Sequence, residues 1–139
     1  MIISLDSFIK KNNKNKVDII NIGSIYGSRV PDFNMYKKGD RFNSEIYGAT
    51  KAGLIQITKY FSTYSYKHNI LVNAIAPGGI FNPKSPQSSK FLKKYSQICP
   101  LKRMAETKEV IGAIIYLLSD SSSYTNGHTI VIDGGFSVW

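Results

Sequence analysis

Tyr47 and Lys51 lie four residues apart in the stretch Tyr47-Gly48-Ala49-Thr50-Lys51. Positions four apart share one face of an α-helix, so a helix here would place the phenol beside the ammonium group. An ammonium group about 5 Å from a phenolate stabilises it by roughly 3 kcal/mol at an effective dielectric constant of about 20. A tyrosine in this setting can exchange a proton near neutral pH, which predicts a general acid/base. The alternative is a solvated lysine beside an aromatic residue at a helix start.

The residues around this pair predict a long helix from about residue 45 to residue 67. Asn43 or Ser44 can cap its first turn, and the exposed His68 and Asn69 would follow its end. Its apolar positions form a broad stripe that faces a core, and they include Ala49, Ala52, Ile55 and Phe61.

Three β-branched runs predict buried strands at residues 17–22, 70–76 and 128–133. Ser24 follows the first run, and Pro77-Gly78-Gly79-Ile80 follows the second. The carboxyl ends of strands are where open α/β sheets bind ligands. A helix capped by Thr107 and running through Leu118 precedes the third strand. This alternation predicts an α/β fold with a parallel sheet, and the long polar loop at 26–45 is predicted to face a substrate.

Length and composition narrow the class of protein. The chain has 139 residues, 42% hydrophobic and 19% charged, which predicts one soluble globular domain over residues 1–139. It contains no apolar run of the roughly 20 residues that span a bilayer. The first 16 residues have the reverse charge order of a secretory signal, which predicts a cytoplasmic protein. Cys99, the only cysteine, is predicted to be a buried thiol, because one cysteine supports neither a disulfide nor a cysteine-based metal site.

A net charge of +9 raises the possibility of nucleic-acid binding. The cations are scattered, however, and the densest group, Lys10, Lys11, Lys14 and Lys16, alternates with asparagines and has no aromatic residues for stacking. We therefore predict no nucleic-acid partner and no membrane partner. Steeply salt-dependent binding to a polynucleotide would indicate a nucleic-acid-binding protein instead.

Five features in the same order resemble the short-chain dehydrogenase/reductase family over nearly the whole chain. The features are Ile19-Ile20-Asn21-Ile22-Gly23-Ser24, Tyr47-Gly48-Ala49-Thr50-Lys51, Val72-Asn73-Ala74-Ile75-Ala76-Pro77-Gly78-Gly79-Ile80, Pro100-Leu101-Lys102-Arg103 and Val131-Ile132-Asp133-Gly134-Gly135. The resemblance implies the carboxyl-terminal half of a Rossmann-type, doubly wound parallel sheet. It also implies an oxidoreductase that moves a hydride between NAD or NADP and a small alcohol or carbonyl substrate.

The resemblance implies a role for each matching residue. Tyr47 would be the catalytic acid/base, Lys51 would assist it and bind the nicotinamide ribose, and Ser24 would hydrogen-bond the reacting oxygen. The nicotinamide pocket would be lined by Pro77, Gly78 and Ile80. The family often has a threonine that contacts the cofactor phosphates where this chain has Asn82.

The separation between Ser24 and Tyr47 is longer than in many family members. The additional residues around positions 31–36 resemble a loop of members associated with surface-carbohydrate or flagellin-sugar modification. The stretch Ser24-Ile25-Tyr26-Gly27 also resembles nucleotide-sugar epimerases and dehydratases of the same superfamily, but those continue into a substrate domain, so the dehydrogenase branch fits better.

The glycine-rich turn that binds the dinucleotide, and the family's catalytic asparagine, match nothing before Ser24. Residues 17–22 would then form an apolar sheet edge, and one sheet face would be poorly covered. We therefore expect a truncated or split form with little activity alone, which pairs with an amino-terminal half or forms a homo-oligomer. The alternative is a non-catalytic interaction remnant.

Overall fold

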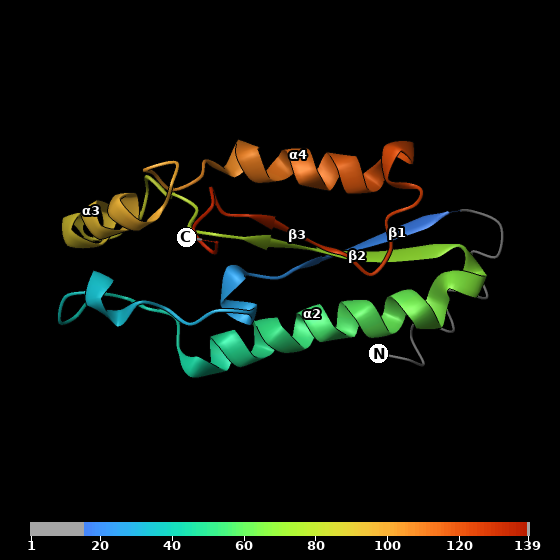
Figure 1. Ribbon diagram of the computed structural model, residues 1–139, viewed down its shortest axis with the longest axis horizontal. Helices are drawn as coiled ribbons and strands as arrows, with labels where there is room; N and C mark the ends of the chain where they lie inside the picture. Colours follow the sequence, from blue (N-terminus) through green and yellow to red (C-terminus); the bar gives the residue numbers. More distant parts are fainter. Residues whose placement is uncertain (1–15, 139) are drawn as a thin grey trace.

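Three parallel strands form a sheet that lies between two helices (Figure 1). The strands are β1 (Val17–Ile22), β2 (Ile70–Pro77) and β3 (Thr129–Ile132), and β2 is the central strand. The computed structural model describes residues 16–138. The charge order of the amino terminus, and most of the basic group Lys10, Lys11, Lys14 and Lys16, fall outside the described residues.

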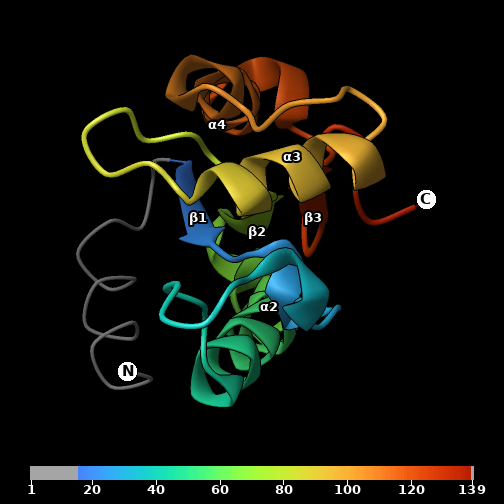
Figure 2. The same cartoon turned by 90° about the vertical axis from the view of Figure 1, so that its left-hand side faces the viewer.

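Each face of the sheet is covered by one long helix. Helix α2 (Glu45–Ser65) lies on one face and α4 (Thr107–Leu118) on the other, while α3 (Ser89–Ile98) lies near the carboxyl ends of the strands (Figures 1 and 2). Short 3₁₀ turns occur at η1 (Ile25–Gly27), η2 (Phe33–Met35), η3 (Tyr66–His68) and η4 (Asp120–Ser122). Both faces therefore carry a helix, which differs from the expectation of a poorly covered face at β2, while the residues of β1 and β3 are half-buried or exposed.

The strand register brings the carboxyl ends of β1 and β2 side by side. Val17 pairs with Ile70 and Ile22 with Ile75, and the Gly23 amide then donates to the Ile75 carbonyl at 2.7 Å. The predicted strand and helix positions agree with the structure to within one or two residues. One cap differs, because Glu106 rather than Thr107 precedes α4 and forms a reciprocal capping box with Glu109.

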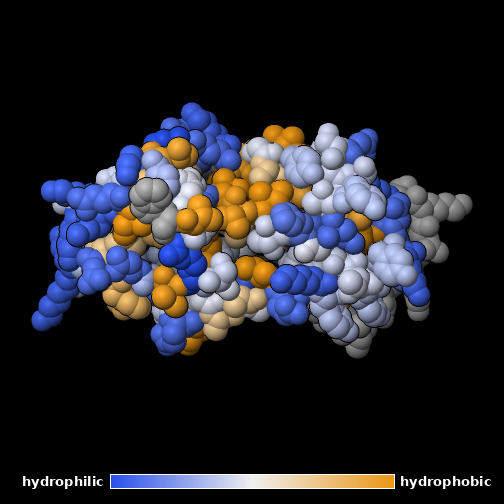
Figure 3. All heavy atoms as spheres, in the orientation of Figure 1, coloured by the Kyte–Doolittle hydropathy of each residue, from blue (hydrophilic) through white to orange (hydrophobic). Residues whose placement is uncertain are grey.

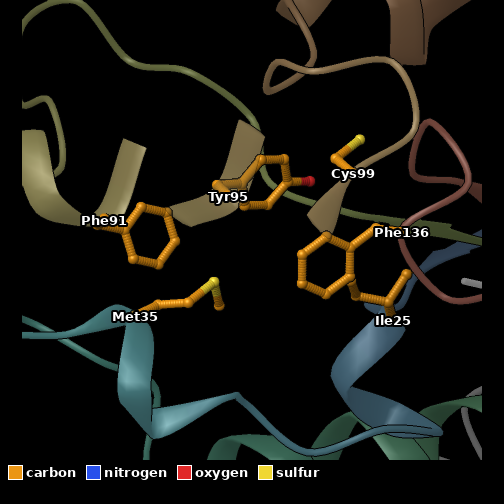
Figure 4. Packing of buried hydrophobic residues seen from close by; sticks show 6 residues of the cluster. All are labelled: Ile25, Met35, Phe91, Tyr95, Cys99 and Phe136. Carbon is orange, nitrogen blue, oxygen red and sulfur yellow. The ribbon is translucent and has the colours of Figure 1, made fainter. Parts of the chain in front are cut away.

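The hydrophobic core consists of three groups of side chains. Phe61, Ile70 and Val72 pack between α2 and the sheet, and Ile75, Val110 and Leu117 pack between α4 and the sheet. The third group lies where α3 meets the strand ends, and Figure 4 shows its six members: Ile25, Met35, Phe91, Tyr95, Cys99 and Phe136. Cys99 is fully buried, as predicted, and its thiol points to the Asp133 and Gly134 carbonyls.

Within the described residues, β1 pairs only with β2 and forms one edge of the sheet, as expected. Apolar residues are also exposed near the middle of the face shown in Figure 3. Exposed apolar residues of α4 and β3 include Ile111, Ile115, Leu118 and Val131. None of the helices in the described part of the chain is both long and apolar enough to cross a membrane.

Candidate active site

Tyr47 and Lys51 lie on one face of α2, near its amino terminus. The helix begins at Glu45, and the Ser44 side chain caps it by accepting a hydrogen bond from the Tyr47 amide at 3.4 Å. The Lys51 ammonium lies 5.5 Å from the centre of the Tyr47 ring. The spacing that suggested an acid/base pair therefore places the two side chains together in the structure.

Lys51 also reaches the end of β1. Its Nζ atom donates a hydrogen bond to the Ile22 carbonyl at 2.7 Å, two residues before Ser24. An ammonium group carries three donors, so two remain for other acceptors at this site. The lysine thus ties the helix that carries Tyr47 to the strand that carries Ser24.

Ser24 is buried at the carboxyl end of β1, where it precedes the turn η1. Its Oγ accepts a hydrogen bond from the Tyr26 amide at 3.2 Å. Because that bond occupies an oxygen lone pair and not the hydroxyl proton, Ser24 keeps its proton to donate to a ligand oxygen. No other bond of the Ser24 hydroxyl is found among residues 16–138.

The turn after Ser24 packs directly against the backbone of α2. A Cβ atom placed on Gly27 would lie 2.8 Å from the Lys51 carbonyl carbon and 2.8 Å from the Ile55 side chain. A Cβ atom on Gly48 would lie 3.2 Å from the Tyr26 carbonyl oxygen. The absence of side chains at these two glycines lets the serine turn and the tyrosine helix approach each other closely.

Pro77 is the last residue of the neighbouring strand, β2, and Gly78 and Ile80 follow it. Gly78 donates to the Ile132 carbonyl at 2.9 Å, and Ile80 forms a parallel bridge with Ala105. That bridge uses the Gly79 carbonyl and the Phe81 amide, so the amide and carbonyl of Ile80 have no backbone partner in the described part of the chain. These two groups are available to a ligand amide.

Two buried or half-buried phenols approach the same end of the sheet. The Tyr95 hydroxyl accepts a hydrogen bond from the Gly79 amide at 3.0 Å, and burial raises the pKa of Tyr95. The pKa of Tyr26 is raised well above its usual range, chiefly by burial and then by interaction with Tyr36. Both phenols therefore stay protonated at neutral pH, so they can act as hydroxyl donors without adding negative charge.

A hollow of about 770 Å³ lies between the loop after η1 and the first half of α2. Tyr47 is part of its wall, together with Tyr26, Arg29, Phe42 and Asn43. The structure places Asn82 elsewhere, in an exposed turn where its side-chain oxygen accepts from the Lys84 amide at 3.0 Å. No group of residues suited to hold a metal ion occurs between residues 16 and 138.

Sequence reasoning missed three contributors to this geometry. The Tyr26 amide orients Ser24, Gly27 admits the backbone of α2, and Asp133 accepts bonds from the amides of Gly135 and Ser137 at 2.9 and 2.7 Å. The spacing of Gly27 three residues after Ser24 was a signal for a tight turn, but it could not show which backbone the turn would meet.

A parallel sheet with helices on both faces, and polar groups gathered at the strand ends, defines an open α/β fold of the dinucleotide-binding class. A family model described as enoyl-(acyl carrier protein) reductase matches residues 7–137. The chain belongs to the short-chain dehydrogenase/reductase family.

Two curated relatives illustrate the similarity. The chain is 33% identical over 138 residues to "Post-translational flagellin modification protein A" of Campylobacter coli, covering 99% of this chain and 53% of the relative. It is 38% identical over 126 residues to "D-arabinitol 2-dehydrogenase [ribulose-forming]" of Candida tropicalis, covering 87% of this chain and 42% of the relative. The chain thus spans about half the length of the curated relatives it matches.

Solved structures give the same result. A short-chain dehydrogenase from Leptospira borgpetersenii with bound NAD⁺ matches with a TM-score of 0.84 and 38% identity, covering 96% of this chain and 49% of that one. Other matching structures contain NADH or NADP. The three strands and their flanking helices correspond to part of the Rossmann-type fold of this family.

Proposed function

We propose that this chain carries the catalytic part of an NAD(P)-dependent oxidoreductase that interconverts an alcohol and a carbonyl. The observation that carries the proposal is that Lys51 lies beside Tyr47 and bonds to the end of β1, where the turn that follows Ser24 packs on α2. The names of two relatives point to a hydroxylated, carbohydrate-like substrate, because one is a D-arabinitol dehydrogenase and another an L-xylulose reductase.

Each residue has one task in this reaction. Tyr47 gives a proton to the carbonyl oxygen in reduction and takes it back in oxidation. Ser24, oriented by the Tyr26 amide, donates its hydroxyl proton to the same oxygen and stabilises the charge that develops there. Lys51 provides a fixed positive charge beside the phenol and keeps donors for ribose hydroxyls.

The residues present fit the nicotinamide end of the cofactor. Lys51 would bind the ribose, Pro77 and Gly78 would line the ring, and the unpaired backbone groups of Ile80 would hold the carboxamide. The cofactor, when bound, supplies or accepts the hydride. Hydride transfer also requires a dinucleotide-binding half. We propose that this half is provided by a segment equivalent to the part of the relatives that this chain does not match.

A hybrid enzyme tests this proposal. The amino-terminal half of the Leptospira dehydrogenase, up to the point where the match begins, is fused to this chain. NAD⁺ is supplied, and the formation of NADH is followed by absorbance with arabinitol and other polyols as substrates. We expect turnover by the hybrid and none by this chain alone, because hydride transfer needs both halves.

Two control proteins make the outcome decisive. A hybrid with Tyr47→Phe keeps the ring and loses the proton donor, so it should bind cofactor and lose turnover. A folded hybrid that binds NADH but oxidises or reduces none of the substrates would contradict catalysis at this site. Micromolar NADH binding with turnover by this chain alone would contradict the need for a second half.

A further inference from the structure

A second hollow, of about 590 Å³, lies between the long loop and the segment that leads into α3. Five of its wall residues come from positions 36–43, and the sixth, Gln87, comes from the segment that leads into α3. The wall consists of Tyr36, Asp40, Arg41, Phe42, Asn43 and Gln87.

The wall combines two aromatic rings with polar groups that have unused hydrogen-bonding capacity. The rings of Tyr36 and Phe42 meet edge to face, with centres 5.9 Å apart. The side-chain amides of Asn43 and Gln87 have no hydrogen-bond partner among residues 16–138, although each amide can both donate and accept. Aromatic surface beside planar amides suits a ligand with hydroxyl groups on a carbon chain or ring.

The charge of this hollow favours an anion. The Asp40 carboxylate already accepts bonds from the Ser88 hydroxyl at 2.6 Å and the Lys37 amide at 3.0 Å, and the charges of Lys37 and Lys90 lie near it. Arg41 has no carboxylate partner in the described part of the chain, and one bond to the Ser85 carbonyl at 3.2 Å leaves most of its five donors unused. A guanidinium group with spare donors can bind a carboxylate or phosphate through two parallel hydrogen bonds.

The hollow is next to the candidate active site. Phe42 and Asn43 belong to its wall and also to the wall of the larger hollow, which contains Tyr47. Ser44, the next residue, caps the helix on which Tyr47 lies. A substrate whose reacting carbon is at Tyr47 could therefore extend past Phe42 into the second hollow.

We propose that this second hollow binds the distal part of a polyhydroxylated, anionic substrate, with its carboxylate or phosphate at Arg41 and its hydroxyl groups at Asn43 and Gln87. The assignment of this ligand as the substrate rests on the proposed function. The binding itself does not, because it involves none of the catalytic residues.

Binding measured on the 139-residue chain without cofactor tests the subsite. Gluconate, glucose 6-phosphate and neutral arabinitol are titrated by ligand-observed NMR, which detects weak complexes. We expect both anions to bind more tightly than arabinitol, and the stronger of the two identifies the anionic group. Arg41→Gln should weaken anion binding about tenfold and leave arabinitol unchanged, since it removes one charge-assisted contact.

Lys38→Gln is the matched control, because it removes one positive charge from the same loop at an exposed position outside the hollow. If both variants weaken anion binding equally, the effect is general charge and the subsite is refuted. Undetectable binding, or anion binding that Arg41→Gln leaves intact, also refutes it. The double variant Asn43→Ala/Gln87→Ala should weaken arabinitol and gluconate alike, and circular dichroism shows whether each variant is folded.

The two proposals can fail separately. If the hybrid enzyme turns over polyols but its KM for gluconate is the same with Arg41→Gln, the subsite is wrong and the function stands. If anion binding depends on Arg41 but the hybrid has no turnover, the function is wrong and the subsite stands as a ligand site.

Discussion

The connection between β1 and α2 has two parts that are built in opposite ways. Residues 23–27 are held by backbone contacts, since the Gly23 amide bonds to Ile75 and Gly27 meets the backbone of α2 with no space for a side chain. Residues 28–44 form local backbone turns, but side chains link them to distant parts of the chain, through bonds such as Lys90 to the Tyr36 carbonyl at 2.6 Å and Arg29 to the Phe136 carbonyl at 2.8 Å.

This difference separates catalysis from recognition. Backbone contacts leave little freedom, so the Ser24 hydroxyl and the α2 face that carries Tyr47 have one relative position. Side-chain contacts can be replaced one at a time, so the longer segment can change in length and surface without moving Ser24. The first part positions the reacting groups, and the second part is suited to determine which molecules reach them.

The largest expected effect comes from removing the acid/base itself. Tyr47→Phe in the hybrid enzyme should lower kcat by a factor of about 10³, in line with the contribution of general acid–base catalysis. The midpoint of urea unfolding should not change, because the Tyr47 hydroxyl has no hydrogen-bond partner among the described residues. Equal losses of activity and stability would mean that Tyr47 is structural.

Gly27→Ala tests whether the backbone contacts of residues 23–27 position the reacting groups. The new methyl group would lie 2.8 Å from the backbone of α2, and overpacking of this kind costs about 1–3 kcal/mol of unfolding free energy. Activity of the hybrid should fall as well, since the serine turn must move away from Lys51. Urea unfolding and kcat are the measurements.

Gly53→Ala is the matched control for that variant. Gly53 lies in the same helix, and nothing lies within 4 Å of the position of its Cβ atom. The substitution should stabilise the chain by about 0.5–1 kcal/mol, because alanine is the better helix former. A loss of stability similar to that of Gly27→Ala would refute the steric explanation.

Tyr36→Phe should have a smaller effect on stability, confined to residues 28–44. It removes the hydroxyl that interacts with Tyr26, at a cost of about 1 kcal/mol for one partly buried hydrogen bond. The fully exposed Tyr124→Phe should leave the urea midpoint unchanged. A large drop in kcat for Tyr36→Phe, without a change in KM, would show that the loop also positions the reacting groups.

The smallest effect is expected from removing the hydrogen bonds of Asp40, which link the long loop to Ser88. Hydrogen bonds from the Lys37 amide and the Ser88 hydroxyl hold the pKa of Asp40 below its usual value. The stabilisation that the ionised Asp40 gives to the folded loop is therefore complete above the ordinary carboxyl pKa. It is lost as the pH falls through the lowered pKa of the folded state. Asp40→Asn should make proteolysis within residues 28–44 faster at neutral pH. It should also remove the increase in this rate that we expect for the parent chain at acidic pH.

The fold could be predicted from the sequence to a large extent. The β-branched runs fixed the three strands, and the alternation with helices fixed the parallel class, because both signals are local and repeated. The coverage of both sheet faces was not predictable, since it depends on where α4 packs and not on its own pattern. The cap at Glu106 was missed because Thr107 is the commoner capping residue type.

The sequence by itself determined which groups could react: the spacing of Tyr47 and Lys51 on one helical face, and Ser24 at a strand end. The tertiary structure alone decided how these groups meet, through the Tyr26 amide on Ser24, the Lys51 bond to Ile22 and the close approach at Gly27. It also decided that Gln87 and Arg41, which are far apart in the sequence, line the same hollow. The physical reason is that periodicity describes one element at a time, whereas contacts between residues far apart in the chain depend on how those elements pack.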